Sequence, residues 1–367
     1  MRYVLMSLLV GWTSASPAQG GPLIPDALSC PQCTIIFRPV ATIGDTIGPG
    51  LLLNRPAAVL RDRSQRFWVV PASGPPLVYD QRGKFVATVG RPGRGPGEFD
   101  QPIGALLLPG DSILVIDGGL FRATVIDPKL KAGRSIRMRE PLYPGVLLQW
   151  PTSVILRGTP ALGPPSNRSL HEVSFQQNEA QTRRSFGRGG TMMRMGGSTA
   201  RFQTLAAARD GGLWSANSYR YELHKWTDQG EHVESFHRQP GWFAKDSPVW
   251  LGNPGTPPPP VVAAIQEDQE GLLWVFLRIP AETWRIGWTR APVGAREVPA
   301  SLIDIEKLFD TMIEVIDPRV GAVLARERLK GYLIGVTDHH QVSIYAEDQD
   351  GNPIIRVIGV TLVGRGG

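Results

Sequence analysis

Cysteine is almost absent from this sequence. The 367 residues contain only Cys30 and Cys33, in the tetrapeptide CPQC. A lone pair supplies half of the ligands of a structural zinc site, so in an oxidising compartment we expect a disulfide. The β-rich stretch TIIF follows the pair, where a thioredoxin-like redox motif needs a helix. The residues PDALS precede Cys30, where a lipid anchor needs an apolar run.

Long apolar runs, hydrolase motifs and dense basic clusters are also missing. No segment beyond the N-terminus approaches the roughly 20 apolar residues of a membrane helix, so we expect no membrane span. No G-x-S-x-G occurs, which leaves an α/β-hydrolase nucleophile elbow without support. The net charge of +6 comes from 32 Arg and seven Lys against 33 acidic residues. These charges are scattered, which disfavours nucleic acid as a partner and favours anionic ligands only weakly.

The N-terminus has the pattern of an export signal. One Arg is followed by an apolar run from Val4 to about Trp12 and by small residues, with Ser16 and Ala18 spaced for signal-peptidase cleavage. We therefore predict a signal peptide over residues 1–18, an N-terminal segment with CPQC over 19–33, and one domain over 34–367. The mature protein is expected in the periplasm or outside the cell. A buried N-terminal strand is the alternative for the apolar run.

A repeated unit sets the fold prediction. Glycine (42) and proline (33) are abundant and spread along the chain, which favours short strands joined by turns. A polar turn followed by an apolar strand recurs with starts at Asp62, Leu108, Gln149, Arg209, Glu267 and Thr337. Small apolar runs precede each copy, and most copies are followed by two more strands. Four consecutive antiparallel strands at this spacing are typical of propeller blades.

Two nearly identical hexapeptides complete the prediction. VATVGR at Val86–Arg91 is the fourth strand of the first unit, whereas VATIGD at Val40–Asp45 has no three strands before it. The last unit has the opposite defect, because the chain stops after its third strand. The sequence therefore predicts an all-β, six-bladed β-propeller of four-stranded antiparallel blades, whose last blade is closed by the N-terminal strand. A β-sandwich or two all-β domains is the alternative.

One stretch resembles a known family. The residues from Val89 to Asp127 resemble the NHL-type propeller repeat, and the matching positions are Gly93, Gly95, Pro96, Gly97, Glu98, Phe99, Pro102, Asp117 and Arg122. The match is specific in this unit and degenerate elsewhere. The whole chain is similar to bacterial secreted propellers of this type, which implies a six-bladed fold and no particular activity. We expect the glycines to permit positive φ and Phe99 to pack between blades. A phosphate cradle would need a helix after the loop, where a strand led by Pro follows.

Long insertions predict where binding occurs. The turns between first and second strands, and between third and fourth strands, are tight, whereas the other connections are long and lie together on the opposite face. Rigid scaffolds carry binding residues on such loops. The candidate ligand-binding residues are Arg91, Arg94, Arg188, Arg194, Arg201, Trp242, Trp250, Trp284, Arg285 and Trp288. Arginine and tryptophan suit anionic groups, sugar rings or a protein partner; the alternative is that the aromatic residues cap the core.

Two function classes follow. We expect a monomeric, non-catalytic exported propeller that binds an exported protein, an anionic glycan or a small ligand, with no cofactor and no metal. The alternative is a metal-dependent lactonase or lyase with a site in the channel. The inner strands are apolar or small, and the acids at their exits, Asp62, Asp210, Glu267 and Asp338, have the positions of turn residues. We expect the histidines to be surface or packing residues, and PASLIDIEKLFDTM to be a helix lying on the propeller.

Overall fold

Short β-strands account for nearly all of the regular structure. The computed structural model describes residues 21–53, 55–138, 147–149, 153–157, 168–176, 179–187, 203–243, 255–288 and 303–365. The predicted signal peptide and the candidates Arg188, Arg194, Arg201 and Trp250 lie outside these residues. Among the described residues, no helix is long and apolar enough to cross a membrane.

Three of the sheets among the described residues have four strands that neighbour one another in chain order. The first such sheet contains β2 (Pro56–Arg61), β3 (Phe67–Pro71), β4 (Leu77–Tyr79) and β5 (Phe85–Thr88). Another contains β16 (Gln203–Ala207), β17 (Leu213–Asn217), β18 (Glu222–Trp226) and β19 (His232–His237). The next contains β20 (Val261–Glu267), β21 (Leu273–Pro280), β22 (Phe309–Asp317) and β23 (Ala322–Leu329). These strands lie where the repeat predicts them.

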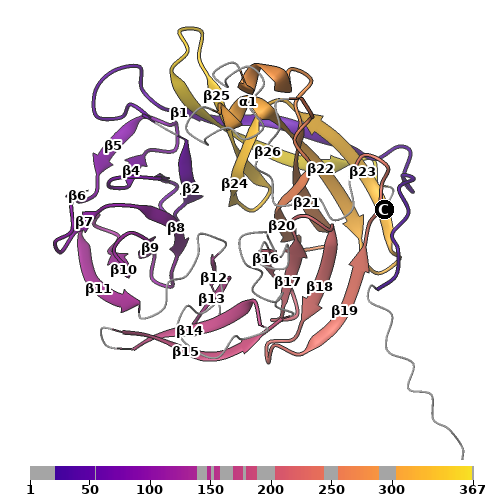
Figure 1. Cartoon of the computed structure of the whole chain (residues 1–367), viewed down its shortest axis with the longest axis horizontal. Coiled ribbons are helices and arrows are strands. Elements are labelled where there is room, and N and C mark those ends of the chain that lie inside the picture. Colours follow the sequence, from indigo (N-terminus) through magenta and orange to yellow (C-terminus); the bar gives the residue numbers. More distant parts are fainter. Residues whose placement is uncertain are drawn as a thin grey trace, which may run out of the picture.

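The N-terminal strand belongs to the sheet that is last in the chain. That sheet has the order β1 (Thr34–Ile43), β26 (Pro353–Val363), β25 (Gln341–Glu347) and β24 (Tyr332–Asp338). β1 runs antiparallel to β26, with Thr34 opposite Val363 and Ile43 opposite Ile355. Figure 1 shows the indigo strand β1 beside the yellow strand β26. The N-terminal strand therefore pairs with the third strand of the last unit, as predicted.

Two units share one sheet, which the sequence did not predict. The eight-stranded sheet contains β8 (Pro102–Leu107), β9 (Ile113–Asp117), β10 (Arg122–Ile126), β11 (Ala132–Met138), β12 (Leu147–Gln149), β13 (Val154–Arg157), β14 (Leu170–Gln176) and β15 (Glu179–Phe186). The outer strands β11 and β15 join in parallel, with Arg137 opposite Glu179 and Met138 opposite Ala180. Where these two outer strands meet, their backbone N–H and C=O groups bond to each other and do not face solvent.

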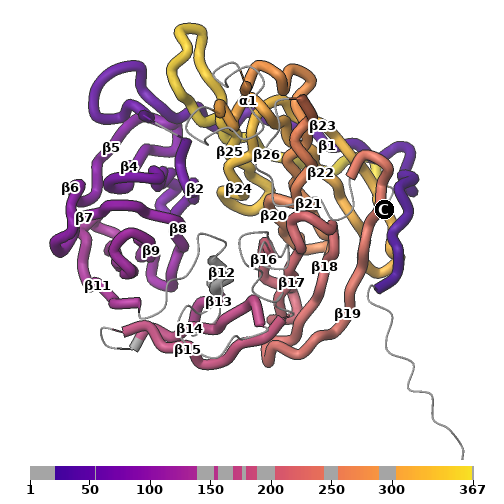
Figure 2. Tube along the Cα trace, viewed as in Figure 1, coloured from indigo at the N-terminus to yellow at the C-terminus, as the bar shows by residue number. Residues whose placement is uncertain are grey.

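The first strands of the units follow one another around a common centre. β2 lies against both β24 and β8, β12 lies between β8 and β16, and β20 lies between β16 and β24. Figure 2 shows the sheets following one another around this centre in chain order. The chain therefore has a curled, propeller-like all-β fold.

The core consists of apolar clusters between neighbouring sheets. Trp68 and Val78 of the first sheet pack against Ile113 and Ile126 of the next, and Phe99 lies buried in the same cluster. A comparable cluster joins the β9 and β13 parts of the eight-stranded sheet. Others join the sheets of β13 and β17, of β17 and β21, of β21 and β25, and of β25 and β3. Because each sheet buries both faces, second strands such as Phe67–Pro71 are continuous apolar runs.

The predicted helix is much shorter than its apolar spacing suggested. α1 spans only Ile305–Leu308, and it lies against the 3₁₀-helix η2 (Trp284–Trp288). The following residue, Phe309, already begins β22 and pairs with Pro280 of β21. Strand pairing therefore takes the residues that a longer helix would need. The helix does lie on the sheets, since the side chain of Leu308 is fully buried.

Candidate functional site

The end of the molecule with short turns uses its polar side chains to close those turns. In the connections from third to fourth strands, one side-chain oxygen accepts the backbone N–H groups two and four residues later. This arrangement occurs at Asp80, Asp127 and Thr227. Such Asx and ST turns satisfy backbone donors that no strand partner reaches. The acids of these turns therefore have a structural role.

The acids at the exits of the inner strands are engaged as well. Glu267 accepts the backbone N–H of Arg209 at 2.8 Å, and the Asp210 carboxylate lies 2.8 Å from the ammonium of Lys225. The bond from Lys225 holds the pKa of Asp210 below its ordinary value. Asp338 accepts the N–H of the following residue at 2.7 Å. Within the described ranges, no group of three or more His, Cys, Asp or Glu could hold a metal ion.

Three histidines lie in packing or tethering positions: His339 and His340, in the turn after β24, and His237, the last residue of β19. His340 packs edge-on against Trp274 with ring centroids 5.0 Å apart, and burial lowers the pKa of its imidazole. His339 Nδ1 lies 3.2 Å from the side-chain nitrogen of Gln266. His237 Nδ1 lies 2.6 Å from the carbonyl oxygen of Gly21. None of these contacts places a histidine beside a second metal ligand.

The residues that resemble the NHL motif form one hydrogen-bonded unit. The Glu98 carboxylate accepts the backbone N–H of Gly95 at 2.6 Å and Nε of Arg91 at 2.7 Å. These two bonds, that of Gly95 first, hold the pKa of Glu98 below its ordinary value. A Cβ at Gly93, where φ is +143°, would lie 2.2 Å from Glu98 Oε2. The loop therefore has no free amide cradle at Gly95, which fits the structural role expected for the glycines.

The later part of the motif ties this loop to the next sheet. Asp117 accepts the backbone N–H groups of Asp100 at 2.8 Å and Gln101 at 3.2 Å. Arg122 donates to the carbonyl oxygens of Arg94, at 3.1 Å, and of Glu98. The Asp and Arg of the motif thus clamp the loop between the sheets, with Phe99 buried beneath it.

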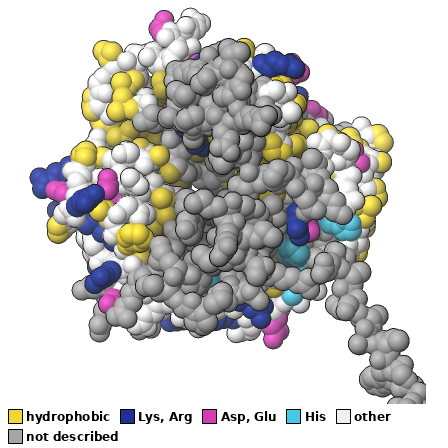
Figure 3. Space-filling model, in the orientation of Figure 1, with side chains coloured by type: hydrophobic (Ala, Val, Ile, Leu, Met, Phe, Trp, Pro, Cys, Tyr) yellow, Lys and Arg dark blue, Asp and Glu magenta, His cyan; other side chains and the backbone are white. Residues whose placement is uncertain are grey.

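Arg91 and Arg94 lie exposed on this loop at the rim. The two strands there, β6 (Arg91–Pro92) and β7 (Glu98–Phe99), form a short parallel pair. The Arg91 side chain is 78% exposed and pairs with Glu98, and the Arg94 side chain is 84% exposed and lies 3.8 Å from Asp100. Figure 3 shows basic and acidic side chains interspersed at this edge. Because each arginine has its own acid, the rim does not form a patch of uncompensated positive charge.

Trp242 lies beside the clamp that holds the N-terminal strap, our name for residues 21–33. Arg238 is fully buried and donates to both carboxylate oxygens of Glu314, at 3.0 and 2.7 Å, and to the carbonyl oxygen of Pro25 at 2.8 Å. Arg326 donates to the same glutamate at 2.6 Å and lies over the Trp242 ring. Trp242 is therefore packed against a structural ion pair.

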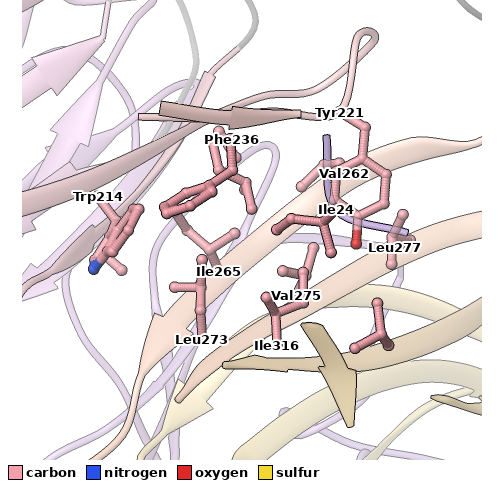
Figure 4. Close-up of a cluster of buried hydrophobic side chains, with 14 of the residues drawn as sticks. Ile24, Trp214, Tyr221, Phe236, Val262, Ile265, Leu273, Val275, Leu277 and Ile316 are labelled. Carbon is pink, nitrogen blue, oxygen red and sulfur yellow. The ribbon is translucent and has the colours of Figure 1, made fainter. Parts of the chain in front are cut away.

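The strap crosses the outer strands β19 and β23 before it continues as β1. Leu23 bridges to His237, and Leu28 bridges to Val323. Figure 4 shows Ile24 among the buried side chains between the two sheets. The strap ends at the disulfide between Cys30 and Cys33, which confirms the expected pairing.

Two predicted tryptophans are core residues. Trp284 and Trp288 are only 6% and 5% exposed and pack with Leu308 and Tyr332 in the cluster beneath α1. Arg285 is exposed and stacks on the Trp284 ring at 4.6 Å. The rings are therefore not available to a ligand at the surface, and the capping alternative describes them better. The long insertion that made these tryptophans binding candidates instead places them in the packing of η2 and α1.

The same cluster supports a pair of arginines that the sequence analysis missed. Arg55 directly precedes β2, Tyr332 begins β24, and Arg278 lies near the end of β21. All three stand at the end of the molecule that carries the long connections. The Arg278 guanidinium lies 4.2 Å from the centroid of the Tyr332 ring, and that of Arg55 lies 4.8 Å from it. Three separate sheets thus bring two cations to one aromatic ring.

The two arginines differ in their partners. Arg55 Nε donates to Glu306 at 3.1 Å, and its Nη1 donates to the Tyr332 hydroxyl at 2.6 Å. Arg278 Nε donates to the carbonyl oxygen of Leu333 at 2.9 Å. In the part of the chain that the structure describes, no carboxylate pairs with Arg278, and no acceptor is bonded to its Nη1 or Nη2. Among the described residues, one edge of the Arg278 guanidinium therefore has no hydrogen-bond acceptor.

The positive charge of Arg278 lies in an unfavourable environment. Burial, and secondarily the charge of Arg55, lower the pKa of Arg278 from its ordinary value, while Tyr332 opposes the shift. Arginine stays protonated in proteins, so Arg278 is a desolvated charge for which Tyr332 and Tyr219 compensate only in part. An anion near Arg278 would supply that compensation. This cluster is the candidate functional site.

A signal for Arg278 was present in the sequence. It is the one charge in LWVFLRIP, a run that is otherwise apolar and lies on a second strand. A charge in a buried strand requires an explanation. Its partners could not be deduced, because Arg55 and Tyr332 come from distant units.

Comparison with known proteins shows likeness in fold. No protein-family model matches the chain, and no curated protein matches it in sequence. A DUF4221-family protein from Bacteroides vulgatus is similar over 90% of this chain and 99% of its own, with a TM-score of 0.60 and 11% identity. The "Putative exported protein" from Bacteroides fragilis is similar over 94% of this chain and 99% of its own, with a TM-score of 0.58 and 9% identity. A gluconolactonase from Xanthomonas campestris has a TM-score of 0.48 and 12% identity over 93% and 98%.

Proposed function

We propose that this protein is an exported six-bladed β-propeller that binds an acidic ligand or partner at its loop-bearing end and catalyses no reaction. The division into six blades is supported by the succession of first strands around the centre and by the four-strand grouping within the sheets. Closure of the ring by the N-terminal strand is supported by the pairing of β1 with β26. Closure of this kind removes two sheet edges at once.

Export is supported by three observations. The first 18 residues have the composition of a signal peptide, although they lie outside the described residues. Cys30 and Cys33 form a disulfide, which persists in oxidising compartments. One of the similar structures belongs to a protein named for export.

The guanidinium of Arg278, which pairs with no carboxylate of the described residues, carries the binding proposal. It is held by stacking on Tyr332 and by one backbone carbonyl, so its orientation is fixed before a ligand arrives. Planar guanidinium groups in such positions recognise carboxylates and related oxyanions. Because the site is largely pre-formed, an anion there loses little free energy to reorganisation.

Thermal unfolding in the presence of anions tests the proposal. Citrate, glucuronate and sulfate should raise the melting temperature of the wild type by mass action. Arg278→Met should fold and lose this response, because it removes the guanidinium and keeps an unbranched side chain. Arg63→Met is the matched control, since Arg63 is exposed in the short β2–β3 turn at the opposite end. An equal response in Arg278→Met and the wild type would overturn the proposal.

A different measurement distinguishes the binding proposal from the enzymatic alternative. A lactonase or lyase of the metal-dependent type would carry a stoichiometric cation after purification without chelator. Elemental analysis, with melting curves before and after EDTA, decides this directly. We expect no stoichiometric metal and the same melting temperature before and after EDTA. A bound metal whose removal by EDTA lowers the melting temperature would favour the enzymatic alternative.

A further inference from the structure

A short turn brings a second tyrosine to the strand pair that carries Arg278. The turn joins β17 to β18, and its Ser218 carbonyl oxygen accepts the backbone N–H of Val262 at 2.9 Å. The residue before it, Val261, is the first of β20 and lies opposite Arg278 of β21. Tyr219, which follows Ser218, therefore stands at the loop-bearing end, where this turn and the strand of Arg278 meet at the start of β20.

The turn itself does not require a tyrosine. The connection between β9 and β10 has the same length, and Gly119 stands there in the position of Tyr219. In both connections, the side chain that ends the earlier strand accepts a backbone N–H three residues later, from Leu120 at 3.0 Å and from Arg220 at 3.2 Å. Because glycine serves in one turn, the ring of Tyr219 is not needed to close the other.

Tyr219 also differs from Tyr332 in what it offers to a ligand. Burial lowers the pKa of Arg278, and both tyrosines are close enough to oppose that shift. Tyr332 is fully buried, stacks on the Arg278 guanidinium at 4.2 Å and accepts a hydrogen bond from Arg55. Tyr219 is half-buried. Of the two tyrosines, Tyr219 is therefore the one with surface left for a ligand.

Arg278 and Tyr219 suit different parts of one molecule. Among the described residues, the Nη1 and Nη2 edge of Arg278 has no acceptor, and its two N–H donors match the two oxygens of a planar carboxylate. A tyrosine ring supplies a rigid, largely apolar face at low conformational cost.

From this arrangement we infer that the site takes a carboxylate carried on a ring, with the carboxylate at Arg278 and the ring against Tyr219. The inference rests on the proposed anion binding at the loop-bearing end and specifies its ligand class. A uronic acid residue of a glycan and an aromatic acid share this chemistry, whereas a small acyclic acid has only the carboxylate.

Arginine side-chain NMR tests the inference on the whole protein. The Arg278 Nε–H is held by Leu333, so it should give a resolved signal, which the spectrum of Arg278→Lys assigns. The probes are sodium acetate, glucuronate and benzoate at constant ionic strength, which have the same single charge at pH 7. In the wild type, glucuronate or benzoate should shift the Arg278 signal with an affinity about tenfold above that of acetate. Which of the two does so identifies a saccharide or an aromatic ligand.

Variants of Tyr219 separate contact with the ring from binding of the anion. Tyr219→Ala and Tyr219→Gly should reduce the preference over acetate to less than about threefold and leave the acetate affinity unchanged, because acetate has no ring. The glycine variant has the residue that the β9–β10 connection already accommodates. Tyr219→Phe keeps the ring and should keep the preference. Phe121→Ala is the matched control, since it removes an exposed aromatic residue from the β9–β10 connection and should change neither affinity.

Two results would overturn the inference while leaving anion binding intact. One is equal binding of the three acids by the wild type, and the other is an undiminished preference in Tyr219→Ala and Tyr219→Gly. No shift of the Arg278 signal with any of the three acids would overturn the proposed function as well.

Discussion

Two buried tryptophans have the same hydrogen-bond partner at the same spacing. Trp68 donates its indole N–H to Asp62 at 2.9 Å, and Trp274 donates to Asp268 at 2.8 Å. In each pair the aspartate stands six residues earlier, at the start of the turn between first and second strands. Its other oxygen accepts a backbone N–H four residues on, from Arg66 in the first pair. The acid thus satisfies a turn and a buried ring together.

The turn between β16 and β17 has the same backbone hydrogen bond, but no aspartate stands at its start. Ala208 occupies the corresponding position, and its N–H donates to Gly212 as in the other two turns. Trp214, six residues later, is buried, and its indole nitrogen has no hydrogen-bond partner among the described residues. A buried donor without a partner loses its bond to water and gains nothing in return.

We predict that Ala208→Asp stabilises the protein. The new carboxylate would accept the Trp214 indole N–H, as Asp62 and Asp268 do for their own tryptophans. The expected gain in the free energy of unfolding is about 1 kcal/mol, which denaturant titration measures. Ala208→Leu is the control, because it fills space without an acceptor. A gain in the Leu variant equal to that in the Asp variant would contradict the account.

A pH dependence follows from Asp317. Bonds from Arg319 hold the pKa of this carboxylate below its ordinary value of 3.8. A carboxyl whose folded pKa is lowered stabilises the fold above its unfolded pKa, and the contribution disappears as pH falls through the folded value. Asp317→Asn should therefore lower the melting temperature at pH 7, with the difference narrowing below pH 3.8. A difference that persists undiminished at pH 2 would show that the loss is due to packing instead.

Among elements, the N-terminal strap depends on one buried arginine. Arg238 bonds to the strap carbonyls and to Glu314 at once, and the Tyr221 hydroxyl donates to the same glutamate. Removing one partner of such a pair leaves a buried charge uncompensated. Arg238→Met should therefore lower the free energy of unfolding by about 3–5 kcal/mol and open the strap to limited proteolysis.

Arg278→Met provides the contrast for that prediction. No carboxylate of the described residues pairs with the Arg278 guanidinium, so its removal leaves no buried carboxylate uncompensated there and should have a much smaller effect on stability. Similar destabilisation in both variants, measured by the same denaturant titration, would contradict the division between a structural and a binding arginine.

The strands were predictable because their causes are local. Alternating apolar residues, glycines and Asx turns specify β3, β9 or β21 from their own sequence. The strap was not predictable, because its contacts with His237 and Val323 join residues more than 200 positions apart. The length of α1 was overestimated because the pairing of Phe309 with Pro280 competes with apolar helical spacing.

The proposed site lies at the end that the sequence analysis indicated, on residues that it did not name. The long connections indicated the loop-bearing end, but the structure places Trp284 and Trp288 in the core and gives Arg91 and Arg94 their own acids. The role of Arg278 could be recognised only from the structure, because its neighbours Arg55 and Tyr332 belong to other sheets.

At the scale of the whole molecule, outer sheet edges are covered in different ways. β11 and β15 pair with each other, and the strap bridges to β19 and β23. Covered edges prevent pairing with other chains. The monomer that the sequence analysis expects stays a prediction.

Deleting segments separates the role of the strap from that of the N-terminal strand. A chain that begins at Thr34 lacks the strap and keeps β1, so it should remain folded with lowered stability. A chain that begins at Gly44 also loses β1 and exposes the edge of β26. It should lose cooperative unfolding or aggregate. Equal stability of the two shortened chains, measured by calorimetry, would contradict closure by β1.

The central claim is an accessible anion site at Arg278, and anomalous diffraction from crystals grown in sodium bromide tests it most directly. We predict a bromide peak within hydrogen-bonding distance of Arg278 Nη1 or Nη2, and no such peak in Arg278→Met. Bromide peaks confined to exposed arginines such as Arg91 and Arg94, with none at Arg278, would contradict the account.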